Sequence, residues 1–175
     1  DSGTEGTIYF DDFVSRSQDY IGRDPEDRIV SPNVIFQDDF ESNDLSAWSS
    51  ANTDEGDLSV RPDEVTQGNY SLEAVIDDQN NLYVTDLSPI DEDHYRARFY
   101  INPDGLSMGE WDQFTILVDY NWIFNVDLKY GEYSFYIVAT TVDDSEDDYE
   151  TDDHAISEGW HAVEIEWQAA SGPGA

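Results

Sequence analysis

Apolar and polar residues alternate with a period of two along most of the chain. Over residues 94–101, apolar side chains from Tyr95 to Ile101 occupy every second position, and two arginines and a tyrosine fill the positions between them. Successive side chains of a strand point to opposite faces, so this pattern predicts a strand with two distinct faces. The same alternation predicts strands at residues 70–76, 122–128, 133–139 and 161–167, with shorter ones at 57–60, 82–85 and 114–118.

The spacing of these strands predicts an all-β fold. No stretch shows a sustained helical period, and the prolines fall between the strand runs, where a missing amide donor does no harm. Strands at regular spacing, separated by turn residues, favour an antiparallel sandwich or barrel, and 175 residues suffice for one buried core. We therefore expect a two-sheet antiparallel β-sandwich of the jelly-roll type.

One acidic strand pattern occurs twice near the start of the sequence. "TIYFDDFVS" (residues 7–15) is echoed by "VIFQDDFES" (residues 34–42), and Asp38 stands 27 positions after Asp11. The segment between them, residues 19–33, carries charge, glycine and two prolines without apolar alternation, which is typical of a segment outside a packed core. We therefore expect three parts, namely a terminal strand in residues 1–22, a linker at 23–33 and the sandwich at 34–175.

Several blocks of the sequence, taken in order, resemble the concanavalin-A-like lectin and glucanase sandwiches (laminin-G-like domains) of large bacterial surface proteins. The blocks are "IFQDDFESNDLSAWS" (35–49), "GNYSLEAVIDD" (68–78), "YVTDLSP" (83–89), "HYRARFYINPD" (94–104) and "HAVEIEWQAASGPGA" (161–175). The resemblance implies that a domain opens with a strand like residues 34–42 and closes with one like "GTIYFDDFVSR" (6–16), the two lying side by side near a sheet edge. It also implies further strands after Ala175. Here the closing-type strand comes first.

Residues 7–16 are therefore expected to complete a sheet, and three arrangements allow this. They can end a preceding domain of a tandem array, belong to a circularly permuted domain, or be donated to a neighbouring subunit. The expected partners are thus adjacent tandem domains or identical subunits. A further interpretation stays open, in which the repeat reflects two acidic strands of one ordinary domain that are alike by chance.

The charge of the chain limits its partners. Asp and Glu number 41 against seven Lys and Arg, which gives a net charge of −34, while five Trp, eleven Tyr and eight Phe argue for a folded protein. So large a negative charge argues against nucleic acid and anionic membranes as partners, and no apolar run is long enough to span a membrane. Without cysteine, no disulfide or thiolate metal site can form. The acidity suits either high salt or an extracellular, cell-surface protein that collects calcium.

Clustered carboxylates suggest calcium sites, because Ca²⁺ prefers six to eight oxygen ligands in a flexible arrangement. If the two acidic strands lie side by side, the carboxylates of five residues converge, and we take these as candidate ligands: Asp11, Asp12, Asp38, Asp39 and Glu41. The resemblance also implies a structural calcium near the terminal strands. Residues 77–81 and 143–153 are two further candidates; the second, with eight acidic residues in eleven, is expected to be a loop. A merely solvated acidic face stays the alternative for each.

Catalysis is not expected. Retaining glucanases of the family that the chain resembles carry a Glu-x-Asp-x-Glu strand, and the nearest segment here is "EIEWQ" (164–168). Glu166 stands where Asp is expected, and Gln168 stands where the acid/base would be, although an amide cannot donate a proton at useful rates. The sequence also contains no G-x-S-x-G or H-E-x-x-H motif.

Carbohydrate binding is the main alternative to a purely structural role. Sugar sites combine an aromatic platform with polar groups for the hydroxyls. The candidate residues are Arg98, Tyr100, Trp111, Tyr120 and Tyr136. Trp122 continues the alternation of the strand after it, so we expect it in the interior, whereas Arg98 and Tyr100 are expected at the surface. The favoured function is a non-catalytic structural module that assembles by strand complementation, with a lectin-like module as the alternative.

Overall fold

The computed structural model describes residues 3–17, 34–87, 93–119, 121–143 and 145–169. Within them the protein is all-β: fourteen strands and one 3-10 turn (Asp54–Gly56) are present, and no α-helix. The strand pairs are antiparallel, which confirms the predicted fold class of an antiparallel β-sandwich protein. The strands are β1 (Glu5–Arg16), β2 (Val34–Asp38), β3 (Ser50–Asn52), β4 (Leu58–Arg61), β5 (Ser71–Ile76), β6 (Tyr83–Thr85), β7 (His94–Asn102), β8 (Leu106–Ser107), β9 (Gln113–Val118), β10 (Phe124–Gly131), β11 (Ser134–Val142), β12 (Asp148–Glu150), β13 (His154–Ile156) and β14 (His161–Gln168).

The chain forms two compact units that alternate along the sequence. One comprises Gly6–Gly105 together with Gly159–Gln168, and the other is built mainly from Leu106–Glu158. The expected linker at residues 23–33, and the end of the expected terminal part, lie outside the described residues.

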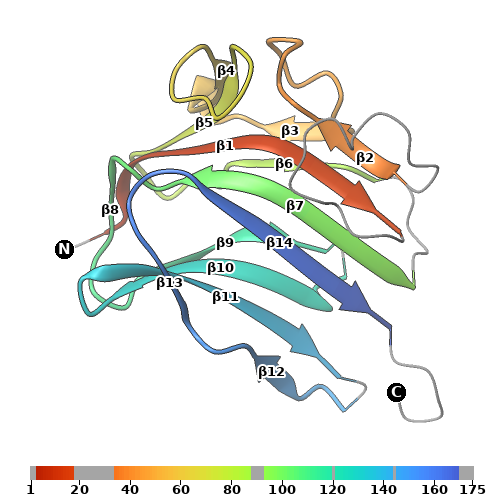
Figure 1. Cartoon of the computed structure of the whole chain (residues 1–175). Helices are drawn as coiled ribbons and strands as arrows, with labels where there is room; N and C mark the ends of the chain where they lie inside the picture. The colour runs from red at the N-terminus through yellow and green to blue at the C-terminus, as the bar shows by residue number, and fades with distance from the viewer. Residues whose placement is uncertain (1–2, 18–33, 88–92, 120, 144, 170–175) are drawn as a thin grey trace. The chain divides into compact units, whose positions relative to one another are not determined.

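The larger sheet belongs to the first unit and has the strand order β14-β7-β1-β5-β4, with β2 paired to β1. Figure 1 shows β14, β7 and β1 running side by side. β1 is an interior strand, because β7 pairs with one of its edges and β5 and then β2 pair with the other. The resemblance implied a place near the sheet edge, so the interior position of β1 is a departure from that pattern.

One face of this sheet is apolar and forms the core of the unit. Ile8 and Phe10 of β1 stand in register with alternate residues of β5 and β7, and Phe99 of β7 lies 6.3 Å from Phe10 between ring centroids. Buried apolar side chains of the face include Ile8, Leu58, Leu72, Ala74, Ala97, Phe99, Ile101 and Val163. The period of two therefore places the apolar positions of β4, β5, β7 and β14 as the sequence predicted.

The second unit contains a sheet of order β12-β11-β10-β9, in which β13 also pairs with β11. β10 and β11 are in register over their whole length, so Phe124, Val126 and Leu128 share one face with Phe135 and Ile137. The central positions of that apolar face are buried. The other face carries the polar positions of β10, from Asn125 to Lys129.

Two expectations about this unit were wrong. Asp148–Glu150, inside the expected acidic loop, forms β12, because its backbone pairs with Thr140 to Val142 of β11. Trp122 is not interior but 64% exposed, since the chain turns between β9 and β10 and the strand begins only at Phe124. The carboxylate of Asp119 accepts hydrogen bonds from the backbone N–H groups of Ile123 and Phe124 and so fixes this turn.

Stability should depend on pH in the alkaline range through Tyr95. Burial raises the pKa of the Tyr95 phenol to about 12. The phenol ionises at about pH 10 in the unfolded chain, so its contribution to the free energy of unfolding is complete below that pH and is lost as the pH rises through about 12, about 3 kcal/mol in total. Tyr95→Phe should therefore lose about 2 kcal/mol less than the parent between about pH 9 and about pH 12, measured by urea unfolding. Equal losses in the two proteins would contradict the burial of this hydroxyl.

Candidate functional site

The two acidic strand patterns lie side by side. β1 and β2 pair antiparallel, with Phe13 opposite Asp38 and Val14 opposite Gln37. The register of β1 against β7 shifts between Asp11 and Val14, where Asp12 adopts a left-handed φ of 57°. This bulge lets β1 continue past the acidic pair while staying in the sheet.

The carboxylates of these strands accept hydrogen bonds from donors of the protein. Asp11 is 1% exposed, and its Oδ2 accepts from the N–H and hydroxyl of Thr66 at 3.0 and 2.8 Å. Asp38 accepts from the Phe40 N–H and from Trp48 Nε1, at 2.9 and 2.8 Å. Burial nevertheless raises the pKa of Asp38, and these two hydrogen bonds oppose the rise.

The exposed members of the acidic set are also engaged. Asp39 accepts a hydrogen bond from the Glu41 N–H, and Glu41 accepts from the Asn69 N–H and side-chain amide and from the Tyr70 N–H. The hydrogen bonds from Asn69 hold the pKa of Glu41 below its usual value. Asp12 is buried and has further polar contacts. In the part of the chain that the structure describes, no group of three or more His, Asp or Glu is arranged to hold a metal ion. Calcium binding at the paired strands stays a prediction.

A second acidic cluster surrounds a hollow of about 590 Å³ in the same unit, lined by Asp54, Glu55, Asp57, Asp77, Asp78 and Asn80. It includes part of the candidate segment 77–81. Burial, and then the neighbouring charge of Asp77, raise the pKa of Asp57. Like charges therefore surround the hollow, and no feature of the described residues around it identifies a ligand.

The polar face of β7 and β14 contains the remaining candidates of the first unit. Arg98 and Tyr100 share this face, as expected, with the Arg98 guanidinium carbon 5.6 Å from the Tyr100 ring centroid. Arg98, however, is only 3% exposed, so its expected surface position was wrong. β7 is flanked by β1 and β14, which places Val14 and Glu164 on either side of Arg98.

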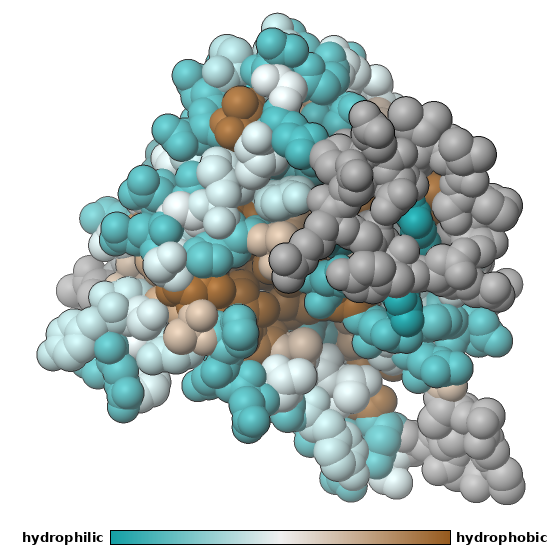
Figure 2. Space-filling view, in the orientation of Figure 1, coloured by the Kyte–Doolittle hydropathy of each residue, from teal (hydrophilic) through white to brown (hydrophobic). Residues whose placement is uncertain are grey.

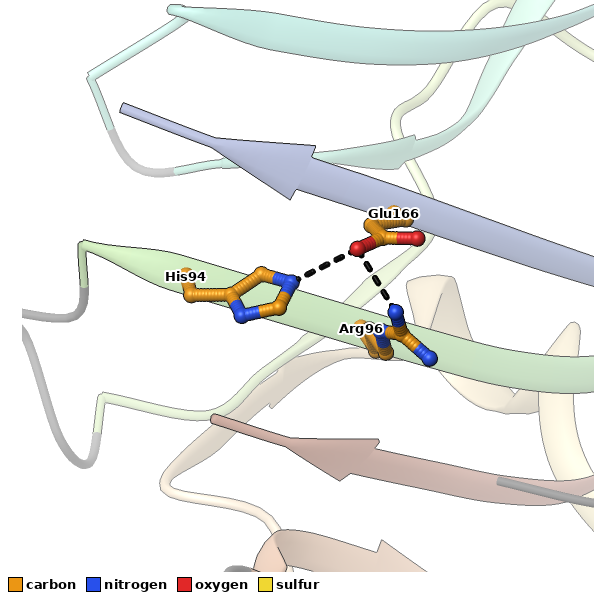
Figure 3. Close-up of polar contacts among 3 residues, drawn as sticks. All are labelled: His94, Arg96 and Glu166. Carbon is orange, nitrogen blue, oxygen red and sulfur yellow. Dashed lines mark hydrogen bonds and ion pairs between the residues drawn. The ribbon is translucent and has the colours of Figure 1, made fainter. Parts of the chain in front are cut away.

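Glu166 of β14 forms a partly exposed ion pair on this face, with its side chain 51% exposed. Figure 3 shows its Oε1 facing two side chains of β7, Arg96 Nη2 at 2.7 Å and His94 Nε2 at 2.9 Å. Hydrogen bonds from Arg96 and His94 lower the pKa of Glu166. A carboxyl group that stays ionised cannot serve as a proton donor near neutral pH. This contact therefore explains Glu166 as a cross-strand ion-pair partner.

The other unit places Trp111 against the polar face of its sheet. A Cβ atom added to Gly131 of β10 would lie 3.2 Å from Cζ3 of the Trp111 ring, so the ring packs on the glycine backbone. The backbone N–H of Trp111 donates to the backbone carbonyl of Tyr130, which fixes Trp111 beside the end of β10. Trp111 is nonetheless 72% exposed, so most of the indole surface is open to solvent.

Polar groups follow Trp111 along this face. Lys129, two residues from Gly131 on the same face of β10, stands in register with Gln113 of β9 and Tyr136 of β11. Its Nζ lies 3.7 Å from a carboxylate oxygen of Glu150. The next row contains Asp127, which accepts a hydrogen bond of 2.7 Å from the Thr115 hydroxyl. We call Trp111, Gly131, Gln113, Lys129, Tyr136, Thr115 and Asp127 the Trp111 face.

Backbone strain accompanies the exposed aromatic residues at this end of the sheet. Trp111 has a φ of 75°, and Tyr133, in the turn between β10 and β11, has a φ of 70° and is 97% exposed. A non-glycine residue in the left-handed region costs about 1–3 kcal/mol, and such residues cluster at functional sites. The backbone conformation of both residues therefore carries an energetic cost, and both side chains are exposed.

Of the predicted sugar-site residues, Trp111 and Tyr136 lie on one face of one sheet, Arg98 and Tyr100 belong to the other unit, and Tyr120 lies outside the described residues. Sequence reasoning missed Lys129 and Gly131. The signal was present, because Asn125, Asp127 and Lys129 alternate with apolar residues and Lys129 is the only lysine. The packing of Trp111 on Gly131 had no signal in the sequence, since it joins the segment between β8 and β9 to the end of β10 through a non-local contact.

No protein-family model matches the sequence, and comparisons with curated proteins and with solved structures gave no match either. The resemblance to concanavalin-A-like domains therefore rests on the quoted sequence blocks alone, while the fold class rests on the structure. Among the described residues, no helix is both long and apolar enough to cross a bilayer.

Proposed function

We propose that this chain is a non-catalytic, extracellular or cell-surface module of the concanavalin-A-like type that binds a glycan on the Trp111 face. The observation that carries the proposal is the Trp111 ring, which is largely exposed yet packed on Gly131, at the end of a row of polar side chains. An exposed indole offers a platform for the apolar face of a pyranose ring. Lys129, Gln113 and Tyr136 supply hydrogen-bond donors and acceptors for its hydroxyl groups.

The charge of the chain favours a neutral glycan. Its net charge is −34, and hydrophilic residues cover most of the surface seen in Figure 2. The buried Asp127 of the Trp111 face and the neighbouring Glu150 together outnumber the single positive charge of Lys129. A sugar that carries carboxylate or sulfate groups would be repelled at long range and at the site. A neutral hexose polymer avoids both costs.

The proposal is tested by a glycan array followed by calorimetric titration of the glycan that binds. Trp111→Ala should raise the dissociation constant for that glycan at least about tenfold, which is a loss of about 1.4 kcal/mol of binding free energy. Because Trp111 is mostly exposed, the folded state should persist, as checked by circular dichroism. Gly131→Ala should also weaken binding, since the new methyl group would displace the indole.

Trp122→Ala is the matched control. Trp122 is similarly exposed and has a left-handed φ of 59°, but it lies in the β9–β10 turn, away from Gly131 and the β10–β11 turn. The Trp122→Ala substitution removes the same aromatic surface and should leave the affinity for the glycan unchanged. The proposal is overturned if the array shows no saturable sugar-specific signal, or if both tryptophan variants lose affinity equally.

A second candidate function is that of a structural building block that assembles by exchange of β1. The observation that favours it is the interior position of β1, an amino-terminal strand that joins β7 to β5 and β2. A sheet that needs such a strand can take it from its own chain or from a neighbour, as in donor-strand complementation. Its partners would be identical subunits or adjacent tandem domains.

A further inference from the structure

One edge of the five-stranded sheet lacks the charges that protect the other edges. β9 ends the strand order and, among the described residues, pairs only with β10. Its sequence, Gln-Phe-Thr-Ile-Leu-Val, contains no charged residue, proline or glycine. Edge strands present unpaired N–H and C=O groups, and proteins usually block them with charged side chains. An uncharged edge in a chain of net charge −34 is therefore an exception.

The other described edges follow the usual rule. β14 carries Glu164 and Glu166, β12 carries Asp148 and Glu150, and β4 ends at Arg61. Among the described strands, those at other sheet edges that have no charged side chain are no longer than three residues. β9 is six residues long, and Val118 at its end is 37% exposed. It is thus the described edge best suited to pair with another strand.

The register of β9 makes it complementary to a second copy of itself. Thr115 pairs with Asp127 and Leu117 with Val126, so Ile116 is an inserted residue, and Phe114 and Leu117 fall on the same apolar face. In a two-fold antiparallel pair centred between Thr115 and Ile116, Phe114 stands opposite the partner's Leu117. Without the insertion, residues three apart would point to opposite faces.

We propose that two copies of this chain associate through β9, which joins their five-stranded sheets across a two-fold axis. The second copy is the occupant because a two-fold self-pairing places Phe114 opposite the partner's Leu117 twice, once on each side of the axis. The same register brings Asp112 near the partner's Asp119 at both ends of the pair. These like charges and the net charge of each copy oppose association at low salt, so the dimer forms when salt screens them.

Sedimentation velocity in a series of NaCl concentrations tests the proposal on the full chain. A doubled mass is expected in molar salt and a monomer at low salt. Ile116→Lys places two lysines beside the two-fold axis and should raise the dimer dissociation constant at least about tenfold. Val118→Lys, at an exposed position, provides a second variant if the first one misfolds. Ala162→Lys adds the same charge to β14 and should leave the dimer intact.

The register itself can be measured, because the chain has no cysteine and a single introduced thiol is unique. With Val118 opposite the partner's Gln113, nitroxide labels on a Val118→Cys variant are separated by five residues of strand, about 17 Å. The proposal is overturned if the chain stays monomeric in high salt. It is equally overturned if a dimer persists in both β9 variants, which would assign association to another surface such as an exchanged β1.

Discussion

A chain that lacks residues 1–17 will not show a cooperative unfolding transition, and an added peptide of residues 5–16 will restore one. β1 contributes its whole length to the larger sheet, with backbone pairs to β2, β5 and β7. Its loss separates β7 and β14 from β5 and β4 and leaves unpaired backbone groups on both sides. It also removes Ile8 and Val14, each 1% exposed.

The magnitude follows from the marginal stability of domains. Burying one large aliphatic side chain contributes about 1.5–3 kcal/mol. The stabilisation lost with two such side chains and two ladders of hydrogen bonds approaches the whole free energy of unfolding, about 5–15 kcal/mol. Near-ultraviolet circular dichroism after dilution from urea measures the result, with and without peptide.

A peptide with Val14→Asp is the control for this experiment. It keeps the length and the acidic character of β1 but places a charge at a buried position, so it should not restore folding. If the truncated chain unfolds cooperatively without any peptide, β1 is dispensable and the strand-exchange function fails. If only the parent peptide restores the transition, complementation from outside the chain is chemically feasible.

The sequence predicted the strands well where two faces differ and poorly where a turn or a non-local neighbour decides. β7, β10, β11 and β14 follow the period of two because one of their faces is apolar. The resemblance to concanavalin-A-like domains implied that the two acidic strands lie side by side, and β1 and β2 do pair. The alternation at Trp122 was misleading, because Asp119 fixes the turn before β10 by accepting backbone hydrogen bonds that no periodicity reveals.

The candidate site was less predictable because its parts come from separate strands. Trp111 and Tyr136 could be proposed from residue type, but their common face depends on the register of β10 with both neighbours. The predicted surface position of Arg98 was wrong for a different reason. Its position in the alternation was correct, yet its side chain is buried, and the burial of a polar face cannot be read from alternation.

Asp11→Ala should lower the free energy of unfolding by about 3–5 kcal/mol, because it leaves two donors of Thr66 unpaired at about 1–3 kcal/mol each and opens a buried site. Asp11→Asn should lose less, since one carbonyl oxygen can still accept both hydrogen bonds. Asp39→Ala is the matched control from the second acidic pattern. Asp39 is exposed and, within the described ranges, accepts a local bond from the Glu41 N–H, so its loss should stay within about 0.5 kcal/mol.

The same variants separate the structural role of Asp11 from calcium binding. A ligand that binds only the folded state raises its stability, so a chelator must lower the melting temperature of the parent if calcium binds at the paired strands. In that case Asp11→Asn, together with Asp38→Asn, should abolish the chelator effect, and added NaCl should not mimic calcium. If Asp11 acts only as a hydrogen-bond acceptor, its substitution costs the same stability with and without chelator. If the chelator still lowers the melting temperature of the Asp11→Asn and Asp38→Asn variants, any bound calcium lies elsewhere in the molecule.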